Sequence, residues 1–445
     1  MKKHNEKRSK KIRNLVAFCS LCAILLSVST YAWFIGMTKV SVNSFEVNIE
    51  TTEGLFLSMD GVNWSYNLDA QDTAAYANNE NVWANTDDNM GLIPMSTVGD
   101  MDETASRMKL FEKASLTAVP GGYRLLSTRV DNYTKTNATS GEYKEGKGYI
   151  AFDLFVKNLT GDQYYPKNDV LNEEAIYLTT DSSVVVDTAG GGKDNSGIEN
   201  TVRVAFVQLG RVNADTDDVA TITGIKCADT YDGKGTELDN RVVTKICRDA
   251  QIWEPNDDVH VQNAINWYDK SCLERVNTAE NKVADKTSYK AGTHCTTLEK
   301  NKAYPTYAIT NEIQVDDYVN VYDGLEYNKY THNTKSYAEY TAQGADKSTF
   351  KLVSFPYFTD TTKELEGNKR VQFMTLAPKS ITKLRVYVYI EGQDIDNYDF
   401  AQLGKHIAIN FGFTKERYEE EDFKDPAYNG PDTDITPTGT ATVAQ

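Results

Sequence analysis

The sequence predicts an all-β protein with a few short helices. The 445 residues include 27 Tyr, 16 Phe and 5 Trp, and aromatic side chains pack well on the pleated surface of a sheet. Several segments also alternate apolar and polar residues with the period of two that is typical of a half-buried strand. Hydrophobic residues make up 40% of the chain and only 10 residues are Pro, which excludes collagen-like, proline-rich and fully disordered proteins.

The expected strands are distributed along most of the chain. Apolar side chains repeat at every second position in four long runs, Ile150–Val156, Val202–Phe206, Leu384–Ile390 and Ile407–Phe413. We expect the last two runs to be antiparallel partners, because an acidic connection of moderate length joins them.

The N-terminal part of the body adds two more strands. The apolar positions of Phe45–Ile49 continue, after a turn, at Leu55–Met59. Val40 and Val42 have the opposite parity to Phe45, and the shift at Asn43-Ser44 predicts a β-bulge or a hinge between two strands.

Helices are expected at only two places. Residues 101–114 place Met101, Ala105 and Met108 at helical spacing, and residues 258–272 carry a similar apolar stripe with Asp258 as a plausible N-cap. Such stripes usually form core, so neither helix is expected to carry chemistry.

Charge divides the chain into a basic head and an acidic body. The chain has 47 Lys+Arg and 64 Asp+Glu, a net charge of −17. Seven of the basic residues lie in the first 13 positions, and residues 14–38 carry no charge; without residues 1–32 the net charge is −23. A body this acidic repels phosphate backbones, so we exclude nucleic acid as a partner.

The basic head and the apolar run after it form an export signal. The apolar run Leu15–Leu26 has the length of a signal-peptide core, and Thr30-Tyr31-Ala32 is a small-x-small cleavage site. We predict cleavage between Ala32 and Trp33. The alternative is an uncleaved N-terminal transmembrane anchor, since the uncharged stretch is long enough to span a bilayer. Either way the cell membrane is a partner during export, and the protein is secreted or on the cell surface.

Four cysteines lie in the exported part, all within one stretch. An even number of cysteines in an oxidising compartment permits two disulfides with three connectivities, and free cysteines are the other reading. The four residues are Cys227, Cys247, Cys272 and Cys295.

The two ends of the body carry a family resemblance. The segment STYAWF, the strand region SFEVNIETTEGLFLSMDG and the closing pair VYVYIEGQDIDNYDF and HIAINFGF resemble secreted Firmicutes proteins of the TasA/camelysin type. The resemblance covers residues 13–60 and 370–415, extends to 145–210 and does not include 210–300. It implies a jelly-roll-like β-sandwich. It also implies a biofilm-matrix fibre subunit whose mature N-terminal strand completes the sheet of a neighbouring subunit.

Together these observations predict the organisation of the chain. Residues 1–32 are the signal peptide or anchor, 33–209 and 301–415 the β-sandwich body, 210–300 a cysteine-containing insertion, and 416–445 a disordered acidic tail. In a fibre the donor strand would present Val40, Val42, Phe45, Val47 and Ile49 to the next subunit, with self-association as the partner interaction. The alternative is that this strand pairs within its own domain.

Enzyme chemistry has little support in the sequence. The resemblance to camelysin-like proteins raises metallopeptidase activity, and a zincin needs two His one helical turn apart with a Glu next to the first. No His is followed by Glu, and there is no GxSxG motif. We name no catalytic residues and no required cofactor, and we predict that the protein is not an enzyme.

The acidic connection near the C-terminus is the best candidate ligand site. Asp394, Asp396, Asn397 and Asp399 place oxygens at spacings that can wrap Ca²⁺, although Asp399 stands where an EF-hand has its glycine. A solvated acidic turn is the alternative. The sequence therefore predicts an exported structural protein of the cell surface or extracellular matrix. The runner-up is a monomeric surface module that binds a glycan or another ligand through its Tyr-rich faces and the 210–300 insertion.

Overall fold

The structure is a computed structural model, and it confirms the all-β prediction. The described residues are 40–41, 44–51, 54–68, 82–83, 91–92, 94–112, 133–135, 143–145, 148–166, 173–189, 191–236, 240–268, 299–304, 307–309, 320–322, 325–327, 352–354, 358–363, 372–392, 394–398, 406–417 and 442–443. The helical segments among them are short and are η3 (Ile198–Thr201), α3 (Val219–Thr223), α4 (Gln262–Tyr268) and α8 (Asp360–Lys363).

The larger sheet is built around β26 (Ser380–Glu391). β26 pairs antiparallel with β16 (Val202–Asn213) on one side and with β13 (Ile150–Asn158) on the other. The sheet is completed by β3 (Leu55–Ser58), β5 (Val82–Trp83), β7 (Pro94–Ser96), β10 (Phe111–Glu112), β17 (Thr230–Tyr231), β18 (Arg241–Lys245), β19 (Gln251–Glu254) and β24 (Phe358–Thr359).

The smaller sheet is built around β27 (His406–Arg417). β14 (Glu174–Leu178) and β15 (Ser183–Val186) follow one another along one side of β27, both antiparallel to it. β2 (Ser44–Thr51) runs parallel to β27 on the other side. The outer strands of this sheet are β4 (Asn67–Leu68) and β25 (Met374–Leu376).

Short strand pairs complete the described secondary structure. They are β1 (Val40–Ser41) with β6 (Gly91–Leu92), β8 (Met101–Asp102) with β9 (Arg107–Met108), β11 (Tyr133–Lys135) with β12 (Tyr143–Glu145), β21 (Asn320–Tyr322) with β22 (Leu325–Tyr327), and β23 (Leu352–Ser354) with both β20 (Tyr307–Ile309) and β28 (Thr442–Val443).

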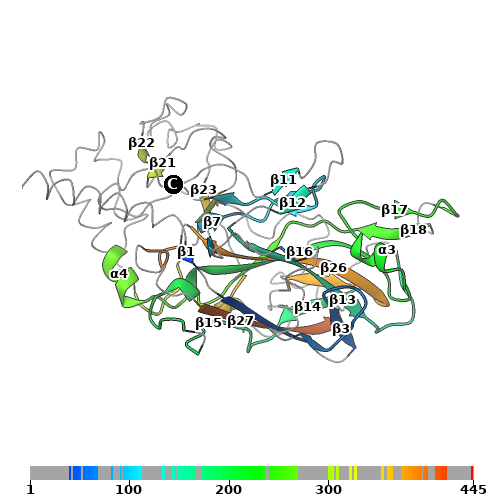
Figure 1. Ribbon diagram of the computed structural model, residues 1–445, viewed down its shortest axis with the longest axis horizontal. Coiled ribbons are helices and arrows are strands. Elements are labelled where there is room, and N and C mark those ends of the chain that lie inside the picture. Colours follow the sequence, from blue (N-terminus) through cyan, green and yellow to red (C-terminus); the bar gives the residue numbers. More distant parts are fainter. Residues whose placement is uncertain are drawn as a thin grey trace, which may run out of the picture. The chain divides into compact units, whose positions relative to one another are not determined.

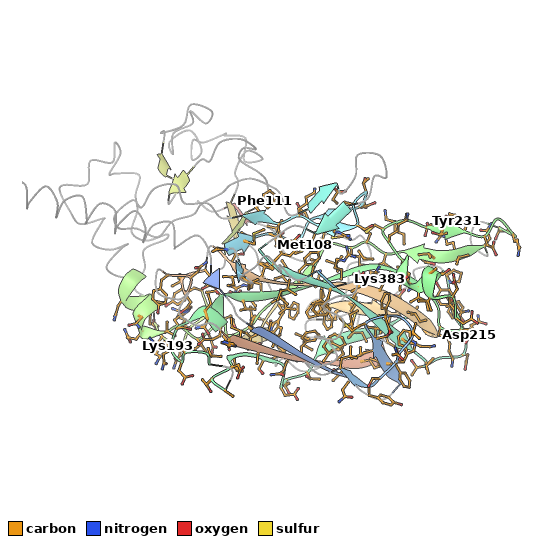
Figure 2. All side chains as sticks on the ribbon, in the orientation of Figure 1. Met108, Phe111, Lys193, Asp215, Tyr231 and Lys383 are labelled. Atoms are coloured by element: carbon orange, nitrogen blue, oxygen red, sulfur yellow. A yellow bond between two sulfur atoms is a disulfide. The ribbon has the colours of Figure 1, made fainter. Side chains whose placement is uncertain are left out.

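The two sheets face one another across a shared hydrophobic core. Figure 1 shows β16, β26 and β13 in one layer and β27 and β15 in the other, and side chains fill the space between the layers in Figure 2. The Phe206 ring of β16 lies 4.5 Å from the Phe373 ring, 5.5 Å from Phe411 and 6.2 Å from Phe413. Aromatic and aliphatic side chains from both sheets thus interdigitate, so the all-β protein is a β-sandwich.

The inner faces of the strands match the sequence pattern. The apolar sets expected for six strands all belong to this core, apart from residues whose side chains lie outside the described set. They are Ile49; Leu55, Leu57 and Met59; Ile150, Phe152, Leu154 and Val156; Val202, Val204 and Phe206; Leu384, Val386, Val388 and Ile390; and Ile407, Ile409, Phe411 and Phe413.

The larger sheet is buried on its second face as well. Tyr387 and Tyr389 alternate with the inner residues of β26 and join another apolar cluster, so every residue of β26 is buried. The same face carries a buried ionic cluster. Asp153 accepts hydrogen bonds from Arg385 at 2.7 and 3.1 Å and lies 2.9 Å from the ammonium of Lys383, which is labelled in Figure 2. Because both faces of this sheet are covered, the polar residues that alternate with the inner apolar ones, such as Asp153 and Arg385, are buried and not in contact with solvent.

Two expectations about secondary structure are wrong. β26 and β27 are not antiparallel partners, because each belongs to a different sheet. Both strands need their apolar faces covered, and the connection between them is long enough to cross the sandwich. The helix expected at 101–114 is replaced by the short strands β8, β9 and β10. The side chain of Asp102 accepts hydrogen bonds from the amides of Thr104 and Ala105, which turns the chain between β8 and β9.

The expected helix at 258–272 is present only in part, as α4. It begins at Gln262, and Asp258 does not cap it. The amide of Val261 instead donates to Asp396, at 3.1 Å.

Two of the expected segment boundaries fall inside strands. The boundary at 209/210 lies within β16, and β18 and β19 of the 210–300 segment pair with β16 in the larger sheet. Residues Val40–Gln445 form one compact unit. Of the expected tail, 416–417 end β27 and Thr442–Val443 form β28, while 418–441 lie outside the described residues.

Candidate functional site

The N-terminal strand β2 pairs with β27 over its full length. Its register runs from Ser44 opposite His406 to Thr51 opposite Phe413, with every residue of β2 paired. Ile49, the residue of β2 whose side chain is described, is fully buried in the sandwich core. β2 therefore supplies both main-chain hydrogen bonds and apolar contact to the last long strand of the chain.

The second edge of β2 is largely without a described strand. β4 pairs with it only at Ile49 and Glu50. Within the part of the chain that the structure describes, residues 44–48 pair with β27 alone.

The predicted break before β2 lies between two strands of different sheets. Val40 is in β1 and pairs with Leu92 of β6, while Phe45 and Val47 are in β2. Val42, at the break itself, lies outside the described residues. In this single chain the candidate donor strand pairs within its own domain, as in the alternative that the sequence left open.

A disulfide joins Cys227 to Cys247. The two Cα atoms are 5.0 Å apart, and both residues are buried against the second face of the larger sheet. This bond agrees with one of the three connectivities. Cys272 and Cys295 lie outside the described residues. Disulfides persist mainly in oxidising compartments.

The acidic connection after β26 contributes to a buried ionic network. Arg203 of β16 is fully buried, and its guanidinium forms ion pairs with Glu254 of β19 and Asp394. It also donates to the main-chain oxygens of Asn200 and Val202, both at 3.0 Å. Arg203 thus ties the acidic connection to two strands and to η3.

His260 and Asp396 form the second half of this network. His260 precedes α4, and its Nδ1 lies 2.6 Å from Asp396 Oδ2, while Nε2 lies 3.0 Å from the carbonyl oxygen of Lys302. A carbonyl only accepts, so Nε2 carries a hydrogen. The short Nδ1–Oδ2 contact therefore also contains a proton, which either the imidazole or the carboxyl group holds.

Gly197 allows the chain before η3 to approach Asp396 and Val261 closely. Gly197 has φ +79°, and an added Cβ would lie 2.7 Å from the Val261 side chain and 3.1 Å from Asp396 Oδ1. Only glycine adopts this backbone conformation without strain while leaving that space free. Gly197 therefore allows the segment before η3 to pack onto Asp396 and the start of α4.

The environment raises the pKa of His260, of Asp396 and of the neighbouring Glu199 in η3. Burial by itself lowers the pKa of His260, but the hydrogen bond and charge of Asp396, the charge of Asp394 and the Lys302 carbonyl hold it above its usual value. Burial raises the pKa of Asp396 against the opposing hydrogen bond from His260. Burial also raises the pKa of Glu199, and the nearby charge of Asp396 adds to this.

We predict that α4 is held more firmly at mildly acidic than at alkaline pH. A raised folded-state pKa means that His260 contributes its full stabilisation below about pH 6.5, the value for an unfolded His. That stabilisation is lost as the pH rises through the folded-state pKa. Hydrogen exchange at the Ile265 amide, which donates to Val261 O at 3.2 Å, should therefore become less protected between pH 6 and 9 after correction for intrinsic rates. His260→Asn should abolish the change, and an unaltered profile in that variant would contradict the assignment.

The calcium ligands expected from the sequence point mainly at protein groups. Asp394 faces Arg203, Asp396 faces His260, and the Asn397 side-chain amide donates to Glu391 O at 3.1 Å. Asp399 lies outside the described residues. Among the residues that the structure describes, no group of three or more His, Cys, Asp or Glu side chains is placed to hold a metal ion.

The sequence did not predict Arg203, Glu254 or His260 as partners of the acidic connection. A signal for Arg203 was present, because a cation within the apolar run VRVAFVQL has to find a buried anion. Nothing in the spacing identified Glu254 or His260, which reach the network only through the pairing of β19 with β16 and the position of α4.

The expected export residues are not part of the described structure. Ala32 and Trp33 lie outside it, and among the described helices none is long and apolar enough to cross a membrane. Comparison of the chain with protein-family models, with curated proteins and with solved structures found no match.

Proposed function

We propose that this is an exported structural protein of the cell surface or extracellular matrix that assembles by passing β2 to the neighbouring subunit. The observation that carries the proposal is the full-length parallel pairing of β2 with β27. β2 lies close to the predicted cleavage site and follows a break from β1, which suits it to exchange between subunits. The Cys227–Cys247 disulfide supports an oxidising location outside the cytoplasm.

The physical basis of assembly is the sheet edge that β2 covers. Without β2, β27 would expose a row of unpaired main-chain groups from His406 to Phe413, and such an edge recruits another strand. A β2 strand from a second copy satisfies the same hydrogen bonds in the same register. Exchange therefore replaces the contacts within one chain by the same contacts between two chains, and it can repeat from subunit to subunit along a fibre.

A cysteine pair tests whether β2 is exchanged. Glu46 and Ala408 are register partners in β2 and β27. In the full-length exported protein, Glu46→Cys with Ala408→Cys should form a disulfide between subunits. Denaturing, non-reducing electrophoresis should then show a ladder of covalent multimers, and electron microscopy should show filaments.

The control pair uses the other side of the same β27 residue. Val185 and Ala408 are register partners in β15 and β27, so Val185→Cys with Ala408→Cys should cross-link within one chain in any assembly. The unsubstituted protein, run alongside, accounts for its own cysteines. Monodisperse particles in which both pairs close within single chains would overturn the proposal.

The second candidate function is a monomeric binding module for a glycan or another surface ligand. It is favoured by an aromatic group at the β3 edge, where Tyr66 is 52% exposed and its ring lies 4.5 Å from that of Phe56. Nearby, the ammonium of Lys157 lies 5.3 Å from the centre of the Trp64 ring. Exposed aromatic groups of this kind often mark binding surfaces. Monodisperse protein that loses polysaccharide binding on Tyr66→Ala would favour this function.

A further inference from the structure

Three side chains from three strands of the two sheets meet at one end of the sandwich. Asn158 is the last residue of β13 in the larger sheet, whereas Glu174 of β14 and Lys415 of β27 belong to the smaller sheet. Asn158 is fully buried, and the side chains of Lys415 and Glu174 are 13% and 20% exposed. An amine, a carboxamide and a carboxyl group are thus held together in a largely enclosed place.

The distances bring the amine next to the carboxamide. Lys415 Nζ lies 3.5 Å from Asn158 Oδ1 and 3.4 Å from Glu174 Oε2. Asn158 Nδ2 donates to Glu174 Oε2 at 2.7 Å and to the carbonyl oxygen of Ala377 at 3.1 Å. One carboxyl group is therefore in reach of both nitrogens, the one that would attack and the one that would leave.

Thr160 polarises the carboxamide carbonyl. Its backbone N–H donates to Asn158 Oδ1 at 3.2 Å, and its hydroxyl lies 2.6 Å from the same oxygen. The hydroxyl is also 2.6 Å from Glu174 Oε2 and 3.1 Å from Lys415 Nζ. Donors fixed on a carbonyl oxygen stabilise the negative charge that develops there when a nucleophile attacks the carbon.

A glycine makes room for the lysine. Gly54 has φ +84°, and an added Cβ would lie 3.2 Å from Lys415 Nζ and 3.1 Å from a Thr160 methyl carbon. The backbone of Gly54 also accepts a hydrogen bond from the amide of Leu159, at 3.1 Å. The turn before β3 therefore closes over the three groups and holds Nζ against the carboxamide.

We propose that Lys415 and Asn158 form an intramolecular isopeptide bond that joins the two sheets covalently. Glu174 takes a proton from the Lys415 ammonium, and the free amine attacks Cγ of Asn158 to form the new C–N bond. The negative charge passes to Oδ1, where Thr160 donates. Glu174 then protonates Nδ2, and the Cγ–Nδ2 bond breaks. One of the two protons left on Nζ passes through Glu174 to the departing ammonia, which leaves as ammonium, and the other stays as the N–H of the new amide.

The reaction is self-contained. Lysine ammonium and carboxamide give a secondary amide and ammonium, with no oxidant or added reactant, and the folded chain supplies the proximity. The bond closes a loop across 257 residues, a constraint that acts mainly on the unfolded chain. The proposal does not rest on the proposed function.

Mass spectrometry of the purified full-length protein tests the bond directly. After denaturation the intact mass should be lower than the sequence mass by one ammonia, beyond the hydrogens lost in disulfides. Digestion should yield a branched peptide containing both Asn158 and Lys415. The branched peptide distinguishes the bond from cyclisation of an asparagine, which also releases ammonia but joins no second segment.

Three variants complete the test. Lys415→Met and Glu174→Gln should each restore the missing ammonia and remove the branched peptide. Lys157→Arg changes the lysine next to Asn158 in sequence and should leave both signals unchanged. An intact mass equal to the sequence mass, with both peptides recovered separately from folded wild-type protein, would show an ordinary ion pair and overturn the proposal. Because that measurement uses the wild type, it holds even if a variant fails to fold.

Discussion

Replacing Arg203 with leucine should lower the free energy of unfolding by about 3–5 kcal/mol, the usual cost of breaking a buried ion pair on one side. Glu254 and Asp394 would keep their charges in a largely enclosed place and lose the guanidinium that faces both. The carbonyl oxygens of Asn200 and Val202 would also lose a donor. Urea unfolding followed by circular dichroism measures this loss.

Arg241→Leu is the matched control. Arg241 faces Asp229 at 3.7 Å, and both side chains are about a quarter exposed, so this substitution should cost less than about 1 kcal/mol. Equal losses in the two variants would mean that burial does not set the strength of the Arg203 network. A further variant that replaces Arg203, Glu254 and Asp394 together by apolar residues should recover much of the lost stability, since no charge would then remain buried alone.

Replacing Phe206 with alanine should cost about 3–5 kcal/mol, as expected for removing a large side chain from a close-packed core. Phe206 projects from the larger sheet into a group of rings that includes Phe373, Phe411 and Phe413. The cavity would lie between the two sheets, where neither can collapse without moving the other. A shift of the urea midpoint with an unchanged slope would report this loss.

Val185→Ala controls for the loss of an aliphatic group from a strand. Val185 lies on β15 of the smaller sheet and is 46% exposed, so the change should stay within about 0.5 kcal/mol. If Phe206→Ala were equally mild, the rings of β27 would not depend on β16, and the sheets would be held together elsewhere.

The inner face of the sandwich could be predicted because it depends on a local pattern. Alternation in runs such as Leu384–Ile390 identifies the side chains that leave water, whatever the neighbouring strand is. The pattern does not identify partners. The β26 and β27 runs resemble a hairpin in sequence, yet they face each other across the core. The reason is that β26 pairs with β13 and β16, and β27 with β2, all of which lie far away in sequence.

The missed features have two other causes, one local and one between distant residues. In 101–114 the apolar spacing fits a helix, but the Asp102 side chain captures the amides of Thr104 and Ala105 and turns the chain instead. The candidate site was predicted in part. The acidic connection was identified, but its partners Arg203 and His260 were not, because complementarity between distant buried charges leaves no periodic trace in a single sequence.

The pairing of β2 with β27 also sets the order in which the fold can close. Ser44–Thr51 is synthesised early, whereas His406–Phe413 follows some 360 residues later. The smaller sheet therefore cannot close before β27 has been synthesised, and such contacts of long sequence separation form slowly. Once a β27 strand has formed, the β2 strand of the same chain and a β2 strand of another chain can compete for the same edge of it. In the assembly proposed above, the local concentration of chains would then decide between a closed monomer and a growing fibre.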